Sequence, residues 1–437
     1  MTTETITVAP PRGMRDLLPA QVALRDWATQ IILQNYGLFG FTRIETPVME
    51  HIHLLRGGEG GENLQLIYEV LKRGEKLESE LEKSSISRND LSDLGLRFDL
   101  TVPLVRYYSN NENDLPKPLK AIQIGSVFRA ESPQKGRLRQ FTQCDIDIIG
   151  TKSEFAEIEL IQATTKALQA LGFNGFTIHI NDRRFLSTLA TYCGFAAERQ
   201  SLVFNTLDKL DKIGMEKIRE ELRSEQHDEA AITKMMEFLQ SYVRAQESGN
   251  TSFEEIKKLL PEAVTGEFME SLQKIIKAVE SLAGDNFSIR FDPSLVRGMG
   301  YYTGAIFEIK YPGYSGSIAG GGRYDKMVGK FSKRDDVPAC GFSIGFERVM
   351  DILTEKGFTP PFNAKKIAFI FDPDRDESAV VVQAANSLRD GQNVVSLQAR
   401  KKDMKKQLDQ LLAQGFSSYC VFKGDPNNLE VKQLEQK

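Results

Sequence analysis

The sequence predicts an α+β protein that carries a helical insertion and ends in a small α/β domain. Short β-type runs separated by turns fill residues 96–150. Residues 183–285 instead show helical periodicity with charged faces and no strand signal of comparable strength. After a proline-bearing stretch at 357–366, a β–α–β–α–β pattern begins that is typical of a parallel sheet. A chain of 437 residues has room for about two to four domains.

The first predicted helix follows an extended, proline-punctuated segment at residues 10–19. Apolar residues then recur at helical spacing from residue 20 to Gly37, which ends the run. Residues 41–49 (FTRIETPVM) have the composition of a strand with Pro47 near its end. The polar and glycine-rich stretch 56–95 predicts a mobile loop or a small excursion from the main fold.

The next part of the chain is rich in short strands. We expect them at LRFDL (96–100), AIQIGSVFR (121–129) and FTQCDIDIIG (141–150). In the last of these, polar and apolar residues alternate from Gln143 to Ile148, so one face of the strand directs polar groups into a site or into solvent. A helix at 153–171 and a strand at 176–180 lead into the helical insertion.

Strand signals resume after the insertion and again after the linker. They fall at 287–291 and 304–310, at the glycine cluster 320–322, and at an apolar run, 341–346, that leads into a helix from Glu347. The C-terminal pattern has strands at 366–371, 393–399 and 417–422, separated by a helix at 376–390 and a basic helix at 400–414.

Composition and charge exclude several classes of protein. The 56 basic and 60 acidic residues give a formal net charge of −4, so any nucleic-acid partner must meet a local basic patch and not bulk charge. No apolar run approaches the roughly 18 residues of a membrane span, and the N-terminus has no apolar core of a secretory signal. The 4 cysteines are far apart and form no CxxC pair, so we expect reduced thiols in a cytosolic protein and no structural metal.

The most informative segment is GSVFRAESPQKGRLRQFTQCDIDIIG at 125–150. Three arginines and one lysine surround a Pro- and Gly-containing loop between two expected strands. A solvated hairpin with scattered charge is the alternative interpretation. However, Arg129 stands at the end of an apolar strand, where a guanidinium needs an anionic partner. Because planar guanidinium groups suit the bidentate geometry of phosphate, this segment predicts phosphate binding.

These residues also carry a resemblance to a known family. FRAE with the following loop and RQF resembles motif 2 of class II aminoacyl-tRNA synthetases, GFSIGFERV (341–349) resembles motif 3, and Pro47 resembles the motif 1 proline. LVRGMGYYTGAIFEI (295–309) and SIAGGGRYD (317–325) are similar to the two signatures of histidyl-tRNA synthetases, and RFDLT and QKGRLRQF match that family too. The likeness covers nearly the whole chain. One departure is Gly300, where the first signature usually has an aspartate that supports the loop.

The resemblance implies a fold and an activity. The fold would be a class II catalytic core over 1–355, built on an antiparallel sheet with helices and interrupted by a helical insertion at 185–285. A linker at 357–366 would join it to an anticodon-binding α/β domain at 364–437. The activity would be ATP-dependent ligation of L-histidine to histidine tRNA through histidyl-adenylate, for protein synthesis. A cytoplasmic homodimer would carry it out, with ATP and Mg²⁺ as cofactors and no membrane partner.

Residue roles follow from the same resemblance. Arg297 and Arg129 would be catalytic, on opposite sides of the α-phosphate. The residues implied in ATP binding are Arg129, Glu131, Arg137, Phe141 and Arg348, with Arg137 and Arg348 on the outer phosphates and Phe141 and Arg348 against adenine. The residues implied in histidine binding are Asp99, Thr101 and Gln143 for the ammonium group, and Asp147, Tyr302 and Tyr301 around the imidazole. Glycines 320–322 would let the backbone approach the substrate.

Contacts with tRNA are implied for two further segments. Gln134 and Lys135 in the motif 2 loop would face the acceptor stem, and the basic helix from Arg400 to Lys406 would either contact anticodon-arm phosphate or form a solvated face. The proton acceptor of the transfer step stays open.

Structural roles and other functions remain as alternatives. A tyrosine pair is often core, and a lone aspartate on a strand often serves a turn or an ion pair. At the level of the whole protein, a synthetase-like paralogue could bind histidine and regulate histidine biosynthesis without charging tRNA. Such paralogues usually lack the C-terminal domain and motif arginines, which this chain keeps. Another class IIa synthetase would lack RGMGYYTG together with GGGRYD.

Overall fold

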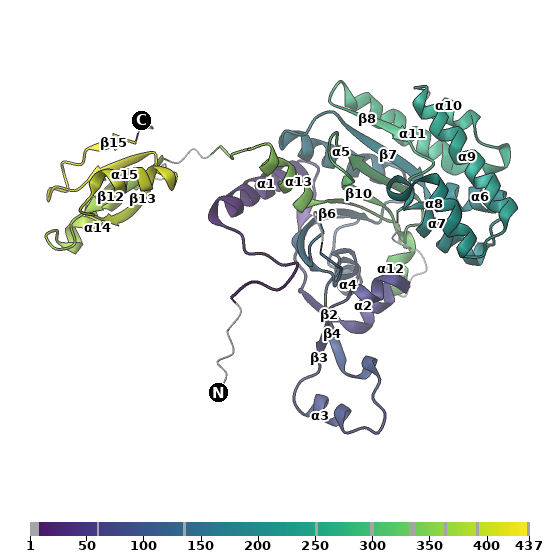
Figure 1. The fold of residues 1–437 in the computed structure, drawn as a ribbon, viewed down its shortest axis with the longest axis horizontal. Helices are drawn as coiled ribbons and strands as arrows, with labels where there is room; N and C mark the ends of the chain where they lie inside the picture. Colours follow the sequence, from purple (N-terminus) through teal and green to yellow (C-terminus); the bar gives the residue numbers. More distant parts are fainter. Residues whose placement is uncertain are drawn as a thin grey trace. The chain divides into compact units, whose positions relative to one another are not determined.

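The structure, a computed structural model, describes residues 8–58, 61–133, 137–249, 252–297, 301–331, 337–361, 365–389 and 393–434. The chain packs as two compact units, Met1–Phe358 and Thr359–Lys437 (Figure 1). Each unit has a hydrophobic core of its own. The described helices include none that is long and apolar enough to span a membrane.

A large mixed sheet is the frame of the first unit. Its strand order is β1-β5-β6-β11-β10-β9-β7-β8. The bounds are β1 Thr42–Arg43, β5 Leu119–Phe128, β6 Gln140–Ile149, β7 Phe176–Asp182, β8 Phe287–Phe291, β9 Ala305–Lys310, β10 Ser317–Arg323 and β11 Ala339–Ile344. The inner strands pair antiparallel, whereas β1 and β8 join the two edges in parallel. The antiparallel centre puts β6, β11 and β10 side by side.

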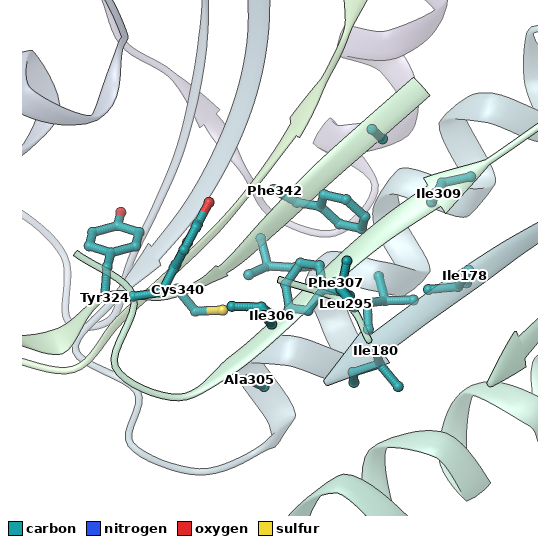
Figure 2. Packing of buried hydrophobic residues seen from close by; sticks show 14 of the residues in the cluster. Ile178, Ile180, Leu295, Ala305, Ile306, Phe307, Ile309, Tyr324, Cys340 and Phe342 are labelled. Atoms are coloured by element: carbon teal, nitrogen blue, oxygen red, sulfur yellow. The ribbon is translucent and has the colours of Figure 1, made fainter. Parts of the chain in front are cut away.

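Helices α1, α5 and α13 pack with the large sheet and bury the hydrophobic core of the first unit. In α1 (Pro19–Gly37), Pro19 stands in the first turn, where its missing N–H costs nothing, and the buried residues recur every fourth position from Leu24 to Tyr36. This helix packs on α5 (Phe155–Ala170), which also contacts β11. Helix α13 (Phe346–Glu355) contacts β6 and β10. Figure 2 shows the strand side of this core, where Phe307 and Phe342 meet.

The insertion is helical, as its pattern predicts. Its helices are α6 Arg183–Cys193, α7 Gln200–Leu207, α8 Leu210–Ser224, α9 Glu229–Glu247, α10 Phe253–Lys258 and α11 Glu267–Ala283. Side-chain caps mark several starts: Asp182 caps α6, Asp228 caps α9, and Ser252 with Glu255 forms a capping box on α10. In Figure 1 these helices lie together beside β7 and β8.

Two predicted strands differ in the structure. Residues 41–49 are not one strand, because β1 ends at Arg43 and β2 (Met49–His51) belongs to a separate sheet. The Arg97 side chain causes this break, since it donates to the backbone carbonyls of Thr46 and Pro47. Residues 96–100 are not a strand either. The Asp99 carboxylate accepts from Val102 N–H at 3.1 Å and starts helix α4 (Thr101–Asn111).

Residues 56–95, predicted as a loop or a small excursion from the main fold, form a small folded subdomain. It contains β3 (Glu69–Leu71), α3 (Glu75–Leu81) and β4 (Ser92–Leu96). With β2 these strands form a sheet of order β2-β4-β3, to which α2 (Ile52–Gly58) contributes packing (Figure 1).

The second unit is the predicted α/β domain with a parallel sheet. β12 (Lys365–Phe371) pairs in parallel with β13 (Asn393–Ala399) and β14 (Ser418–Val421), and the sequence did not predict the antiparallel strand β15 (Val431–Gln433). Alternation along β12 serves two cores: Ile367 and Phe369 pack with α14 (Ser378–Ser387), whereas Ala368 and Ile370 pack with α15 (Met404–Ala413).

Candidate active site

A cavity of about 310 Å³ opens on the large sheet of the first unit. Its lining comes from β6, β10 and β11, from the segment after β5, and from the start of α13. All of the predicted site residues except Asp99 line it. A concave site of this size, with a few converging polar groups, is typical of small-molecule binding.

Strand β6 supplies one wall of the cavity through its alternation. Phe141, Gln143, Asp145 and Asp147 stand at every second position and all line the cavity. The intervening Cys144, Ile146 and Ile148 are buried in the core. The polar face predicted for this strand is therefore directed into a site, and not into solvent.

The neighbouring strands provide a floor of glycines. Gly341 lies opposite Asp147, and a side chain at Gly341 would overlap the Asp147 carboxylate. On β10, a Cβ at Gly320 would overlap the guanidinium group of Arg297, and one at Gly322 would come within 2.9 Å of the Tyr302 ring. Glycines 320–322 line the cavity, so the expectation that they let the backbone come close to a substrate stays a prediction. The structure adds that they also leave room for the site's own side chains and for the neighbouring strand.

Four arginines bring positive charge to the cavity: Arg129, Arg137, Arg297 and Arg348. Arg129 Nε donates to Phe98 O at 3.0 Å, and its guanidinium lies 5.1 Å from the Phe141 ring centroid. Arg137 lies 3.6 Å from a carboxylate oxygen of Glu131. Because Phe98 and Phe141 hold Arg129 from two sides, its guanidinium is oriented before any ligand arrives.

The two remaining arginines, Arg297 and Arg348, are half-buried. Arg297 lies over Gly320 with Nη1 3.6 Å from Glu308 Oε2. Arg348 donates to the carbonyl oxygen of Ser317, and its burial lowers its pKa from the usual value. Burial strengthens electrostatic attraction to an anion in the cavity, because water screens it less.

The end of β6 away from Phe141 carries the acidic and aromatic groups. Tyr324 Oη donates to Asp147 Oδ1 at 2.6 Å, and the rings of Tyr301 and Tyr302 lie 4.8 Å apart. Burial raises the pKa of the Asp147 carboxyl to about 7, although the hydrogen bond from Tyr324 opposes this shift. Burial, together with the charge of Asp147, also raises the pKa of Asp145 well above its usual range.

Three buried acceptor atoms in and beside β6 have no hydrogen-bond partner among the described residues. Within the described residues, Asp99 Oδ2, Gln143 Oε1 and Asp145 Oδ1 are buried without a hydrogen bond. Asp99 does not line the cavity, and burial raises its pKa to about 6. Buried acceptors without donors cost free energy, so this arrangement favours a ligand that brings several N–H groups.

Sequence reasoning missed three residues of the site. Asp145 shares the face of β6 on which Gln143 and Asp147 were selected, and Tyr324 is the second residue after the glycine cluster. Period-two alternation and the GGGRYD segment were therefore signals that could have identified both. Glu347 was the third. It accepts hydrogen bonds from Arg15, Arg25 and Thr142 N–H, which join the N-terminal segment, α1 and β6 to the helix of Arg348.

Some predicted residues fall outside the described part of the chain. Gly300 is one, and Gln134 and Lys135 of the motif 2 loop are two others.

Comparison with known proteins identifies the family. The family model for histidyl-tRNA synthetase matches residues 13–349. The chain belongs to the histidyl-tRNA synthetase family. A curated relative from Leifsonia xyli subsp. xyli, named histidine–tRNA ligase, is 42% identical over 96% of this chain and 96% of its own length.

Solved structures agree on the fold. The crystal structure of histidyl-tRNA synthetase from Nostoc sp. PCC 7120 matches with a TM-score of 0.75 and 26% identity, over 98% of this chain and 95% of that one. A structure described as an ATP phosphoribosyltransferase regulatory subunit/histidyl-tRNA synthetase from Bacillus halodurans C matches with a TM-score of 0.73 and 21% identity, over 96% of this chain and 100% of that one. At that identity the second match shows a shared fold alone.

Proposed function

We propose that the protein attaches L-histidine to histidine tRNA at the expense of ATP, through a histidyl-adenylate intermediate. The observation that carries this proposal is the composition of one cavity. Arginines that suit phosphate and carboxylate line it, together with buried acceptors that lack donors and so suit an ammonium group. A site of this kind can hold an amino acid and a nucleotide side by side.

The first step would join two anions, so charge stabilisation and positioning must carry it. The histidine carboxylate attacks the α-phosphorus of ATP, and pyrophosphate leaves with its bonding electron pair. Arg129 and Arg297 would neutralise the charge that gathers at the α-phosphate. Arg137 and Arg348 would bind the outer phosphates. Phe141 and Arg348 would enclose adenine, with Glu131 accepting from its amino group.

Histidine would be recognised at the acidic end of β6. Thr101 and Gln143, which line the cavity, would receive the α-ammonium group, and Gln143 provides an unpartnered acceptor there. Asp99 was expected to share this role; its carboxylate is also buried and unpartnered but does not line the cavity, so it would have to act through its charge and not by direct contact. Asp147 and Tyr302 would each bond one imidazole nitrogen, with Tyr301 beside them. A site that pairs both nitrogens rejects side chains that lack them, because its own buried groups would stay unsatisfied.

Mg²⁺ would enter with the ATP phosphates. In nucleotide sites this ion is usually held by one or two carboxylates together with phosphate oxygens, and it neutralises phosphate charge. The described residues contain no group of three His, Cys, Asp or Glu side chains that could hold a metal ion alone. The arginines that face the cavity fit the phosphate part of such a complex.

Histidine tRNA would accept the histidyl group in the second step. The hydroxyl of its terminal ribose attacks the adenylate carbonyl, and AMP leaves. The second unit would contact the anticodon arm through the exposed basic residues Lys402, Lys405 and Lys406 around the start of α15. The protein would act in the cytoplasm as a homodimer.

The decisive experiment is amino-acid-dependent exchange of pyrophosphate into ATP, run with all twenty amino acids and followed by charging of histidine tRNA. We expect exchange with histidine alone. Arg297→Ala should lower its turnover roughly 10²–10³-fold, the loss typical of one electrostatic donor. Histidine binding without exchange or charging would instead favour the regulatory function, and exchange with another amino acid would exclude the proposed substrate.

A further inference from the structure

The segment that carries Arg297 is short and firmly attached to the sheet. It runs from Asp292, directly after β8, to Arg297. Asp292 N–H donates to Ile180 O at 2.9 Å, and Leu295 N–H donates to Asp292 O at 3.0 Å. Asn181 Nδ2 donates to Leu295 O at 2.9 Å. The end of β7 therefore fixes the backbone within two residues of Arg297.

The carboxylate of Asp292 is the centre of a buried network at the start of this segment. His179 Nδ1 lies 2.6 Å from Oδ2, while Tyr242 Oη donates to Oδ1 at 2.9 Å. Ser294 donates to Oδ1 twice, through its backbone N–H at 3.0 Å and its hydroxyl at 2.5 Å. Burial alone would raise the pKa of Asp292, but His179, Ser294 and Tyr242 together hold this pKa well below its usual range.

Tyr242 brings the helical insertion into this network. It stands on α9 and is 2% exposed, and its hydroxyl also accepts from Gln246 Nε2 at 2.6 Å. Tyr242 Oη is thus oriented from its own helix and bonds across to the loop that carries Arg297. Neither His179 nor Tyr242 lines the cavity of the candidate site.

Apolar contacts hold the same segment from two sides. Leu295 is 6% exposed and packs near Ile178, Ile180 and Phe307 of the sheet (Figure 2). Pro293, Ser294 and Val296 face a narrow apolar space on the insertion side. The insertion residues that line this space are Leu186, Leu189, Phe204, Leu207, Leu210, Met235 and Leu239. The segment is therefore clamped between the sheet and the insertion, with Arg297 at its end.

We infer that Tyr242 and His179 are positioning residues for Arg297, and that through Asp292 they couple the helical insertion to the adenylation step. This inference rests on the proposed function, because Arg297 must act on the phosphate for its position to matter. The residues of the network do not line the cavity, so its loss should change how well the transition state is stabilised and leave ground-state binding nearly intact. Turnover should fall, and the KM values should stay.

Tyr242→Phe is the sharpest test, because it removes one hydroxyl and keeps the packed ring. We expect kcat of histidine-dependent pyrophosphate exchange to fall roughly tenfold, since misplacement of a catalytic group by about 1 Å can cost on the order of 10²-fold. KM for histidine and ATP should change little. Tyr192→Phe is the matched control, because Tyr192 lies on α6 with 44% of its surface exposed. Ser294→Ala is a second variant that removes another donor to Asp292.

A double-mutant comparison separates positioning from plain stability. In an Arg297→Ala background, Tyr242→Phe should cause no further loss of kcat, while the loss of thermal stability should be the same in both backgrounds. An equal fall of kcat in both backgrounds would overturn the inference, as would unchanged kcat for Tyr242→Phe and Ser294→Ala. A wild-type protein without histidine-dependent exchange would instead contradict the proposed function itself.

Discussion

Asp147 combines deep burial, a hydrogen bond from Tyr324 and a place at the acidic end of the cavity. If it binds one imidazole nitrogen and Tyr302 the other, each variant should weaken histidine binding and spare ATP. We predict that Asp147→Ala and Tyr302→Phe both raise the KM for histidine in pyrophosphate exchange. Asp147→Ala should be worse, because it removes a whole carboxyl group that becomes a charged acceptor as the pH rises above its pKa of about 7. Hydrogen bonds to charged groups are worth about 1.5–3 kcal/mol.

The KM for ATP is the internal control of this experiment. A changed KM for ATP with an unchanged KM for histidine would mean that these two residues belong to the other substrate.

The raised pKa of Asp147 also predicts a pH dependence of stability. A carboxyl with a pKa of about 7 in the folded state, against roughly 3.9 when unfolded, favours folding only while it is protonated. Its contribution is fully present below about pH 4 and is lost as the pH rises through 7. Asp147→Asn cannot ionise, so without ligand it should be more stable than wild type at pH 8, by about 1.4 kcal/mol or more, and nearly equal at pH 4.

Urea unfolding at these two pH values measures the difference. Asp145 and Asp99 also have raised pKa values, and comparison with wild type at each pH cancels only the part of their contributions that does not depend on the charge of Asp147. Because that charge raises the pKa of Asp145, its removal in Asp147→Asn should add to the stabilisation at pH 8. A variant less stable than wild type at pH 8 would contradict the prediction.

Strand β10 illustrates how positions without a side chain can shape a site. Because a Cβ at Gly320 would overlap the Arg297 guanidinium, Gly320→Ala should displace that group. We predict a fall in kcat of pyrophosphate exchange on the order of 10²-fold, with a smaller change in the KM for histidine. Gly37→Ala is the control, since its added Cβ meets nothing within 4 Å. Equal activity of the two variants would show that Arg297 does not need this space.

Comparison of individual strands shows which features of the site could be predicted from the sequence. The alternation in β6 is local and follows the strand period, so its cavity-facing side could be deduced from the residues alone. The break between β1 and β2 could not, because Arg97, about fifty residues away, causes it by bonding Thr46 and Pro47. The space that Gly320 leaves is likewise set by a distant partner, Arg297. Local patterns thus predicted the polar face of β6, whereas contacts between distant segments determined where glycines are needed on β10.

At the scale of the whole molecule, exposed apolar residues next to β2 point to self-association. Pro47 is exposed, and Val48 and Met49 expose 41% and 50% of their surface. Adjacent exposed apolar residues are often buried between protein chains, and most oligomers pair identical surfaces. We predict a homodimer of twice the 49.1 kDa chain mass in sedimentation equilibrium at micromolar concentration. Val48→Asp should shift it toward monomer, whereas Val394→Asp, at an exposed position of the second unit, should not.

The separate cores of the two units predict a division of labour. Every residue that lines the cavity precedes Thr359, and the second unit packs its own apolar residues on both faces of its sheet. A chain that stops near Asn363 should therefore keep histidine-dependent pyrophosphate exchange near the full-length rate and lose most charging of histidine tRNA. Circular dichroism would verify its folding. In the full-length chain, replacing Lys402, Lys405 and Lys406 with alanine should weaken charging in a salt-dependent way and spare exchange, because phosphate contacts release counterions. Loss of exchange in a folded truncated chain would mean that adenylation itself needs the second unit.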